Sequence, residues 1–280
     1  NRADKLSLTV LNHDLQFFDD PLFRKGNMLI VSWGYAESMS IPRRCQIRKV
    51  TGFKALKVEA LGREIELNVE TRTRVFEGKS RSEVALEIAR EWGFRDEELV
   101  HIQPTHAYAH IAQSRMTDAQ FLRRLAAKEG FEWYIDHDGF HFHERNFFQQ
   151  TIRTLRWFDD PDASEIQDIS IENDVTRRAG SVSVKGHNPT QRRTIDVDAS
   201  LLTEKQRAVL GHVVDAPGKS EKAVPGFRSI AHHAAHGTTE IDDAAAKRHA
   251  SATLRKAPQM AVKMSLTIEG DPNVHAKSII

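Results

Sequence analysis

The stretch QSRMTDAQFLRRLAAKEGFEWY, residues 113–134, carries the strongest structural signal in the chain. Thr117 and Gln120 form a capping box, in which two side chains satisfy backbone N–H groups at the start of a helix. Apolar residues then recur at helical spacing up to Gly130, a residue that favours the left-handed conformation at a helix end. The alternating aromatic residues that follow predict a β-hairpin, with Asp138 and Gly139 as its type I′ turn. The helix stripe is Phe121, Leu122, Leu125 and Ala126, and the hairpin strands carry Phe131, Trp133, Ile135, Phe140 and Phe142.

A helix with the same signals precedes this stretch. Ser80 and Glu83 form another capping box, and Gly93 is placed to end the helix. Residues 76–148 are therefore predicted to form a small α/β unit. The apolar positions of this first helix are Val84, Ala85, Ile88, Ala89 and Trp92.

Within residues 1–75, stretches such as residues 5–10 alternate in polarity with a period of two, which is typical of strands with one solvated face. A mostly apolar run over residues 28–33 predicts a strand buried on both faces. Residues 65–75 alternate over a longer distance and predict a long strand with one charged face. Several strands at short spacing, without a helical period, indicate a barrel or a sandwich. The other strands are predicted around Leu6, Leu8 and Val10, around Cys45, Ile47 and Val50, and around Leu56, Val58 and Ala60.

Residues 149–280 form a second β-rich block with one helix and one long loop. The loop is predicted over residues 203–236, the helix over residues 242–256 and the last strand over residues 260–268. The tetrapeptide Phe-Asp-Asp-Pro occurs at residues 18–21 and again at residues 158–161. Duplication of a β-barrel explains this repeat, and so does chance, because both copies are common turn sequences. The remaining strands are predicted around Leu155 and Trp157, around Ile169, Ile171 and Val175, around Val182 and Val184, and around Ile195 and Val197.

Composition excludes several protein classes. The 280 residues carry 40 Lys and Arg against 39 Asp and Glu, so a strongly basic nucleic-acid-binding protein is not expected. A single cysteine excludes an internal disulfide framework and a four-cysteine zinc site. No apolar run approaches the length of a membrane-spanning helix, and the first residues lack the charged-then-apolar pattern of a secretory leader, so none is expected. Both ends begin or stop next to strand-like residues, so we expect the chain to be trimmed relative to the full gene product.

Two groups of histidines are candidate metal ligands. His232, His233 and His236, with Glu240 one turn further, would share one face of a helix. Alanines stand where a zinc protease has its catalytic glutamate, so a solvated loop is favoured over a metal site. The second group, His137, His141 and His143, surrounds the hairpin turn, and the favoured interpretation is a polar outer face of the hairpin.

Other reactive residues have structural explanations that outweigh a functional one. Cys45 lies on a predicted strand, where a buried, inert thiol is expected. The chain has no nucleotide-binding glycine loop and no hydrolase signature, so no catalytic residue, cofactor or metal site is assigned. Asp19, Asp20, Asp159 and Asp160 precede prolines and are interpreted as turn residues rather than as paired carboxylates or cation ligands. Arg43, Arg44, Arg48, Lys49, Arg123, Arg124, Arg177, Arg178, Arg192 and Arg193 are interpreted as solvated or salt-bridged residues rather than as a nucleic-acid patch.

Several segments, taken in order, resemble the phage late control protein D family. These are the baseplate hub proteins of contractile tails, and they are related to the N-terminal part of VgrG proteins of type VI secretion. The resemblance extends over nearly the whole chain. The matching segments are residues 19–23 with Gly26 and residues 29–35, residues 76–84, residues 113–126 leading into residues 129–134, and residues 266–272.

This resemblance implies a mainly β fold with an α/β insertion. Two similar β-barrels, residues 1–75 and 149–280, would flank the insertion at residues 76–148. Three copies would form a ring of pseudo-sixfold symmetry, a structural adaptor without enzymatic activity between a trimeric spike and a hexameric tube. The charged face around Glu64, Glu66, Glu70, Arg72 and Arg74 would then pair across subunits or line a wet channel.

The partners implied are two further copies of the chain, a VgrG-like or needle-like spike protein, the inner tube protein and other baseplate proteins. Neither a membrane nor a specific nucleic acid is implied as a partner. The protein would be assembled in the bacterial cytoplasm and would reside in the baseplate. Phage tails, tailocins, extracellular injection machines and secretion systems all fit this resemblance.

Two other functions are weighed against the hub. Residues 78–99 faintly resemble a LysM module, which would make the chain a peptidoglycan-binding or wall-degrading tail protein. The second is a metal-dependent hydrolase that uses His232, His233, His236 and Glu240.

Overall fold

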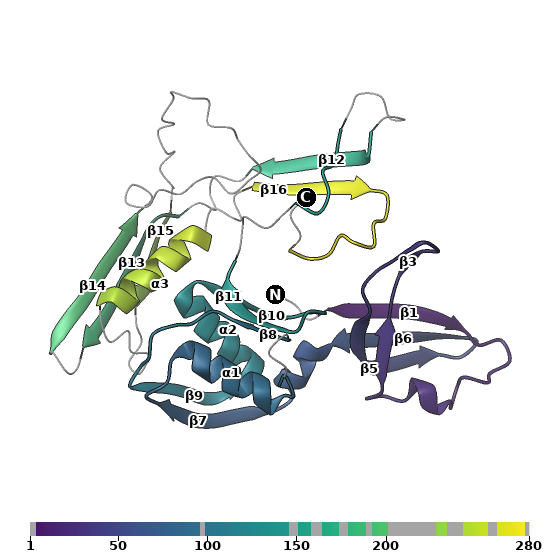
Figure 1. Cartoon of the computed structure of the whole chain (residues 1–280), viewed down its shortest axis with the longest axis horizontal. Helices are drawn as coiled ribbons and strands as arrows, with labels where there is room; N and C mark the ends of the chain where they lie inside the picture. Colours follow the sequence, from purple (N-terminus) through teal and green to yellow (C-terminus); the bar gives the residue numbers. More distant parts are fainter. Residues whose placement is uncertain are drawn as a thin grey trace. The chain divides into compact units, whose positions relative to one another are not determined.

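The computed structural model shows a mainly β protein with three α-helices among its described residues (Figure 1). The chain divides into two compact units. The first unit comprises residues 1–126, 132–144 and 270–277, and the second comprises residues 127–131, 145–269 and 278–280. The structure describes residues 4–95, 99–145, 151–157, 164–173, 179–188, 192–200, 228–233, 243–256, 262–277 and 280.

An antiparallel sheet of four strands begins the first unit. Its buried side carries Ile47, Leu56, Val58 and Ala60, as the alternating polarity predicts. A β-bulge between Ile47 and Lys49 shifts the alternation, which explains why the apolar positions run 45, 47 and then 50. In the order of the sheet, the strands are β1 (Lys5–Leu11), β6 (Ala55–Gly62), β5 (Arg43–Gly52) and β2 (Met28–Val31).

The strand β2 differs from the prediction for residues 28–33. It lies at an edge of the sheet, and Ile30 is 67% exposed, so the strand is not buried on both faces. The sheet is an open half-barrel within the described residues, with β1 at its other edge. A short 3₁₀ helix, η1 (Pro21–Phe23), and the two-stranded ribbon of β3 (Gly34–Tyr35) and β4 (Ser38–Met39) complete this part.

The predicted long strand over residues 65–75 is wrong in its first half. Residues there form a 3₁₀ helix, η2 (Arg63–Asn68), and a strand starts only at β7 (Thr71–Glu77). Glu64 is buried and pairs with Arg123, which a strand continued from residue 65 would not allow. Glu64 was expected to pair across subunits or to line a channel, but it pairs with Arg123 of the same chain.

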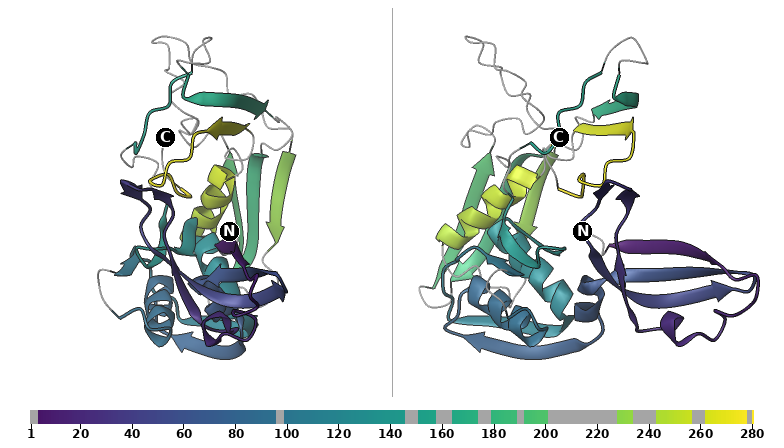
Figure 2. Two further views of the ribbon diagram at one scale, coloured as in Figure 1. Left: turned by 90° about the vertical axis from the view of Figure 1, so that its right-hand side faces the viewer. Right: turned by 45° about the vertical axis from the view of Figure 1, so that its right-hand side comes forward.

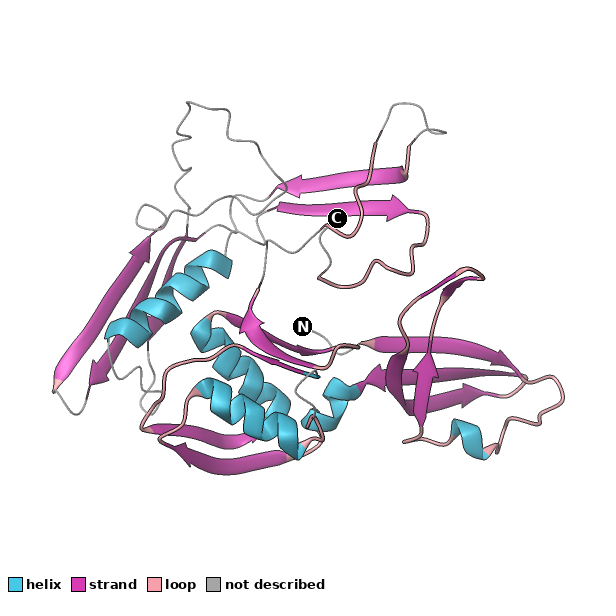
Figure 3. Cartoon of the chain, viewed as in Figure 1, coloured by secondary structure: helices cyan, strands magenta, loops and turns pink. Residues whose placement is uncertain are grey.

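Two helices lie between two small sheets in the α/β part of the first unit (Figures 1 and 3). Both predicted capping boxes form: Ser80 with Glu83, and Thr117 with Gln120. Phe76 of one sheet stacks on Phe121 of a helix, with ring centroids 6.0 Å apart. The elements are α1 (Arg81–Glu91), α2 (Asp118–Glu129), the antiparallel pair of β7 and β9 (His110–Thr117), and the sheet of β10 (Phe131–Ile135), β11 (Phe140–Glu144) and β8 (Val100–Ile102).

The hairpin of β10 and β11 forms where it was predicted, but its turn is of another kind. A type I′ turn needs positive φ at both central residues, and Asp138 does not have it. The Asp138 amide instead donates to Asp136 Oδ1 at 2.9 Å. Gly139 has a φ of +121°, and a Cβ there would lie 2.2 Å from the Leu99 carbonyl oxygen. Only glycine therefore allows β8 to approach this turn.

A buried carboxylate joins the elements of the α/β part. Asp118, the first residue of α2, is 1% exposed; it accepts hydrogen bonds from three side chains and forms an ion pair with a fourth. Because every partner comes from a neighbouring element, the carboxylate fixes β7, β9 and the end of α1 around the start of α2. The hydrogen bonds come from Arg74 at 2.9 Å, Trp92 Nε1 at 2.8 Å and Gln113 Nε2 at 2.8 Å, and the ion pair is with Arg72 at 3.2 Å.

Residues 270–277 return to the first unit and pack on the hairpin. The Lys277 ammonium pairs with Glu132 at 2.8 Å and lies 3.3 Å from the centroid of the Tyr134 ring. Both partners belong to β10. The contacts that hold this segment, far along the chain, to the hairpin therefore include an ion pair and a cation–π contact.

The second unit contains a strand pair and a three-stranded sheet. The sheet packs one face against a helix through Val182, Val184 and Ile195, which meet Ala246 and Ala250 (Figure 2). The predicted helix over residues 242–256 and the predicted last strand are both confirmed. The elements are β12 (Ile166–Asn173) paired with β16 (Val262–Ile268), the sheet in the order β14 (Arg193–Ser200), β13 (Ala179–Asn188) and β15 (Arg228–His233), and α3 (Asp243–Lys256).

The predicted long loop over residues 203–236 contains a strand. Residues 228–233 form β15, which runs parallel to β13. Residues 201–227 and 234–242 lie outside the described part of the chain. None of the described helices has the length and apolar character needed to cross a membrane.

Replacing the buried carboxylate tests its structural importance. Asp118→Asn replaces one carboxylate oxygen, which accepts hydrogen bonds, by an NH₂ group that faces other N–H groups and also removes the negative charge. We therefore expect a loss of at least about 2 kcal/mol in the free energy of unfolding. Urea denaturation followed by circular dichroism measures this loss.

The matched control uses a carboxylate on the same arginine. Glu70 lies 3.5 Å from Arg72 and is 67% exposed, so Glu70→Gln is expected to cost less than about 1 kcal/mol. Equal losses for the two variants would contradict a central role for Asp118.

Candidate functional site

A first apolar surface follows β2 and the ribbon of β3 and β4. We define the N-terminal apolar surface as the exposed side chains of residues 28–41. The ribbon is held by reciprocal hydrogen bonds, in which the Trp33 amide donates to Ser40 Oγ and the Ser40 amide donates to the Trp33 carbonyl. Such a density of exposed large apolar residues is typical of an interaction surface. Its members are Met28, Ile30, Trp33, Tyr35, Met39 and Ile41.

A second apolar surface lies on the pair of β12 and β16. Ile169 is directly opposite Leu266, and Ile171 is directly opposite Met264. Cross-strand partners share a face of the sheet, so these four side chains form one patch, the β12–β16 apolar surface. All four are exposed, and Ile171 is 61% exposed. A two-stranded pair is marginal by itself in water, so this patch indicates that the pair gains stability from a further contact.

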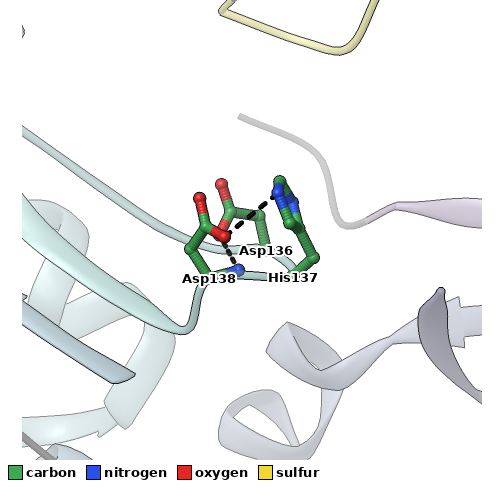
Figure 4. Close-up of side chains that lie close together, drawn as sticks. All are labelled: Asp136, His137 and Asp138. Atoms are coloured by element: carbon green, nitrogen blue, oxygen red, sulfur yellow. Dashed lines mark hydrogen bonds and ion pairs between the residues drawn. The ribbon is translucent and has the colours of Figure 1, made fainter. Parts of the chain in front are cut away.

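The hairpin carries a cluster of histidines and carboxylates. His137 Nε2 lies 3.1 Å from Asp138 Oδ1. Asp136, His137 and Asp138 each place one possible metal-ligand atom within 4.8 Å of the other two (Figure 4). Burial lowers the pKa of the His137 imidazole, and this outweighs the opposing effect of the Asp138 charge. Burial raises the pKa of Asp136, but hydrogen bonds from His141 and the Asp138 amide prevail, so this pKa lies below its ordinary value.

Of the two histidines of β11, His141 does not lie on the solvated outer face that was predicted, whereas His143 is partly exposed. His141 is 8% exposed because its ring is stacked between Tyr134 and His101, at centroid distances of 4.4 and 4.5 Å. These two residues belong to β10 and β8, the strands on either side of β11. The alternation along β11 was predicted correctly, but the second face is covered by neighbouring aromatic side chains.

A cavity of about 520 Å³ lies beside α1. Its lining combines apolar residues such as Leu86, Val100 and Ile102 with charged residues such as Arg90 and Arg95. The cavity belongs to the segment that was compared with a LysM module. Hydrogen bonds from Ser80 in the helix cap lower the pKa of Glu83, which also lines the cavity.

Comparison with known proteins assigns the family. The model of the phage tail baseplate hub (GPD) family matches residues 55–278, which is well over half of the chain. The chain belongs to this baseplate hub family. The resemblance recognised from the motifs at residues 76–84 and 113–134 is thereby confirmed.

Solved structures agree in fold. A tail protein from Neisseria meningitidis MC58 shares 13% sequence identity at a TM-score of 0.64, over 96% of this chain and 73% of that one. The 43 kDa tail protein of prophage MuSo2 from Shewanella oneidensis shares 12% identity at a TM-score of 0.60, over 96% of this chain and 74% of that one. No curated protein matches the hub in sequence.

The first histidine candidate does not have the helical geometry on which it depended. The backbone of His232 and His233 belongs to strand β15 rather than to a helix. His236 and Glu240 lie outside the described residues, so the four-residue set as a whole stays a prediction.

Of the acidic turn residues, the structure describes the first pair and leaves the second pair outside the described residues. Asp20 accepts a hydrogen bond from the Leu22 amide at 2.8 Å and caps η1, which confirms the turn interpretation for this residue. Asp159 and Asp160 lie outside the described residues of the hub, as do Arg177 and Arg178. Of the basic pairs, Arg123 forms an ion pair with the buried Glu64.

Cys45 of the hub is buried, as predicted, and it is 6% exposed. Burial raises the pKa of its thiol, the Asp4 carboxylate adds to this effect, and Arg43 opposes it. A raised pKa leaves little thiolate at neutral pH, so both access and protonation make the thiol unreactive.

We expect Cys45 to react with a thiol reagent at least about tenfold more slowly in the folded hub than in the denatured chain. Because it is the one cysteine of the sequence, absorbance of the released thiol product follows this residue alone. Equal rates in buffer and in denaturant would contradict the buried environment of β5.

Proposed function

We propose that three copies of the hub assemble into a ring that adapts a trimeric spike to a hexameric tube. The observation that carries the proposal is the family match over residues 55–278, which makes the chain a phage tail baseplate hub protein. Membership in a structural family also supports the expectation that the hub is not an enzyme. The rest of the support comes from surfaces that a single chain leaves exposed.

The β12–β16 apolar surface supports the proposal, because it offers apolar side chains that can be buried between subunits. The patch of Ile169, Ile171, Met264 and Leu266 offers four neighbouring apolar side chains, and each gains free energy on removal from water. The edges of β12 and β16 also present backbone groups that another strand can pair with. A copy of the same chain is a suitable occupant, because identical copies close into rings when the rotation between them closes.

The half-barrel of the first unit supports the same proposal. Its edge strands β1 and β2 have no further partner among the described residues, and β2 adjoins the N-terminal apolar surface. Natural proteins protect such edges by closing a barrel or by pairing with another chain. Closure against another copy would protect both the edge and the apolar residues next to it.

Two similar barrels in each of three copies would give six modules in the ring. In this arrangement residues 1–75 and 149–280 supply the modules, and residues 76–148 form the insertion between them. Pseudo-sixfold symmetry would face the tube, while the true threefold symmetry would face the spike. The partners are then the spike protein, the inner tube protein and other baseplate proteins, in a particle assembled in the bacterial cytoplasm.

Mass and mutation test the ring together. We expect a sedimentation mass about three times the 31.8 kDa of one chain. Ile171→Asp places a charge in the β12–β16 apolar surface, so it should shift the protein toward monomer while the circular dichroism spectrum stays unchanged.

Val69→Asp is the matched control. Val69 is also an exposed apolar residue, but it belongs to neither apolar surface, so this variant should stay trimeric. A wild-type protein that remains monomeric at high concentration would contradict the proposal. So would a trimer that is unaffected by both Ile171→Asp and Ile30→Asp.

A further inference from the structure

Two imidazole rings of β11 face one another through nitrogen atoms. His141 Nδ1 lies 3.3 Å from His143 Nε2, and the ring planes are inclined by 74°. The residues are two apart on one strand, so their side chains share a face. This contact plays no part in the apolar surfaces described above.

The second nitrogen of each ring fixes where its proton lies. His141 Nε2 is 2.9 Å from Asp136 Oδ1, and His143 Nδ1 is 2.8 Å from the Glu144 carbonyl oxygen. A carboxylate and a carbonyl oxygen can only accept hydrogen bonds. Each neutral ring therefore carries its hydrogen on the nitrogen that points away from the other ring.

The facing nitrogens are consequently both unprotonated when the rings are neutral. Two lone pairs at 3.3 Å repel one another unless a positive charge lies between them. An extra proton on one ring would supply that charge, and a metal cation would supply it as well.

The geometry favours a metal cation. Two nitrogen ligands of a tetrahedral zinc ion, each about 2.0–2.1 Å from the metal, lie about 3.3 Å apart. Histidine ligands also donate their other N–H group to a carboxylate or a backbone carbonyl. His141 and His143 show both features: the separation of 3.3 Å and one acceptor of each kind.

The first of the two rings is held rigidly. His141 is stacked between Tyr134 and His101, with interplanar angles of 6° and 23°. His143 is only partly buried, so an ion can reach the pair from its side. The nearby Lys277 ammonium is offset by its ion pair with Glu132. The pair is thus ordered before an ion arrives, which reduces the entropy lost on binding.

We propose that His141 and His143 bind a divalent transition-metal ion of the class that prefers imidazole, such as Zn²⁺ or Cu²⁺, with water in the remaining positions. Asp136 is a positioning residue that fixes the orientation of the His141 ring. The site shares Asp136 with the turn cluster of Asp136, His137 and Asp138, but its ligand nitrogens are different, and His137 Nε2 is already paired with Asp138.

Calorimetric titration with Zn²⁺ tests the site on the untagged full chain. The experiment uses the variant His232→Ala/His233→Ala/His236→Ala as its background, so that the other histidine group cannot contribute. We expect one Zn²⁺ per chain, an affinity at least tenfold weaker after His143→Ala, and a loss of about tenfold after Asp136→Asn. His110→Ala is the matched control, because His110 is an exposed histidine on β9, and it should change nothing.

Spectroscopy gives a second readout. Electron paramagnetic resonance of the Cu²⁺-loaded chain should show coupling to two imidazole nitrogens, and His143→Ala should remove one of them. Three results would overturn the proposal: no bound zinc, binding unchanged by His143→Ala, or binding abolished by Asp138→Asn instead. Loss of binding in Asp138→Asn would place the ion in the turn cluster. Absence of bound zinc would mean that the two histidines share a proton instead of a metal ion.

Discussion

The Asp118 carboxylate is a charged group taken almost completely out of water at the start of a helix. Such a group is tolerated only when its lone pairs are satisfied, and here Arg74, Trp92 and Gln113 donate to it while Arg72 forms an ion pair with it. The position at the first turn of α2 adds the favourable field of the helix N-terminus. The α/β part is therefore organised around one electrostatic centre as well as around its aromatic core. The hairpin that carries His141 and His143 follows α2 directly and depends on that framework.

The β-rich parts obey a different constraint. Their strands bury one face incompletely and leave edges open, so an isolated chain exposes Ile30 and Ile171 to water. In the proposed ring, other copies would cover these surfaces, and the removal of their apolar side chains from water would drive assembly. The α/β part would then hold its own shape, while the β parts would provide the surface for partners.

Local signals made much of this fold predictable. The capping boxes at Ser80 and Thr117 and the alternation along β1, β13 and β16 depend on near neighbours in sequence, so they could be recognised without a structure. Long-range effects could not. The pairing of Glu64 with Arg123 accompanies η2 in place of a strand, and the stacking of Tyr134 and His101 buries His141. The facing nitrogens of His141 and His143 have a partial signal in their spacing of two. Their acceptors, the Asp136 carboxylate and the Glu144 carbonyl, become apparent only in three dimensions.

The return of residues 270–277 to the hairpin has a consequence for synthesis. Glu132 and Lys277 are separated by 145 positions, and residues 145–269, most of the second unit, lie between them in the chain. Contacts of such long range form slowly, because a large loop must close before they contribute. A ribosome would finish β10 well before the lysine that covers Tyr134 exists. The first unit can thus complete its packing only after residues 270–277 have been translated, so Tyr134 lacks the Lys277 ammonium over its ring until then.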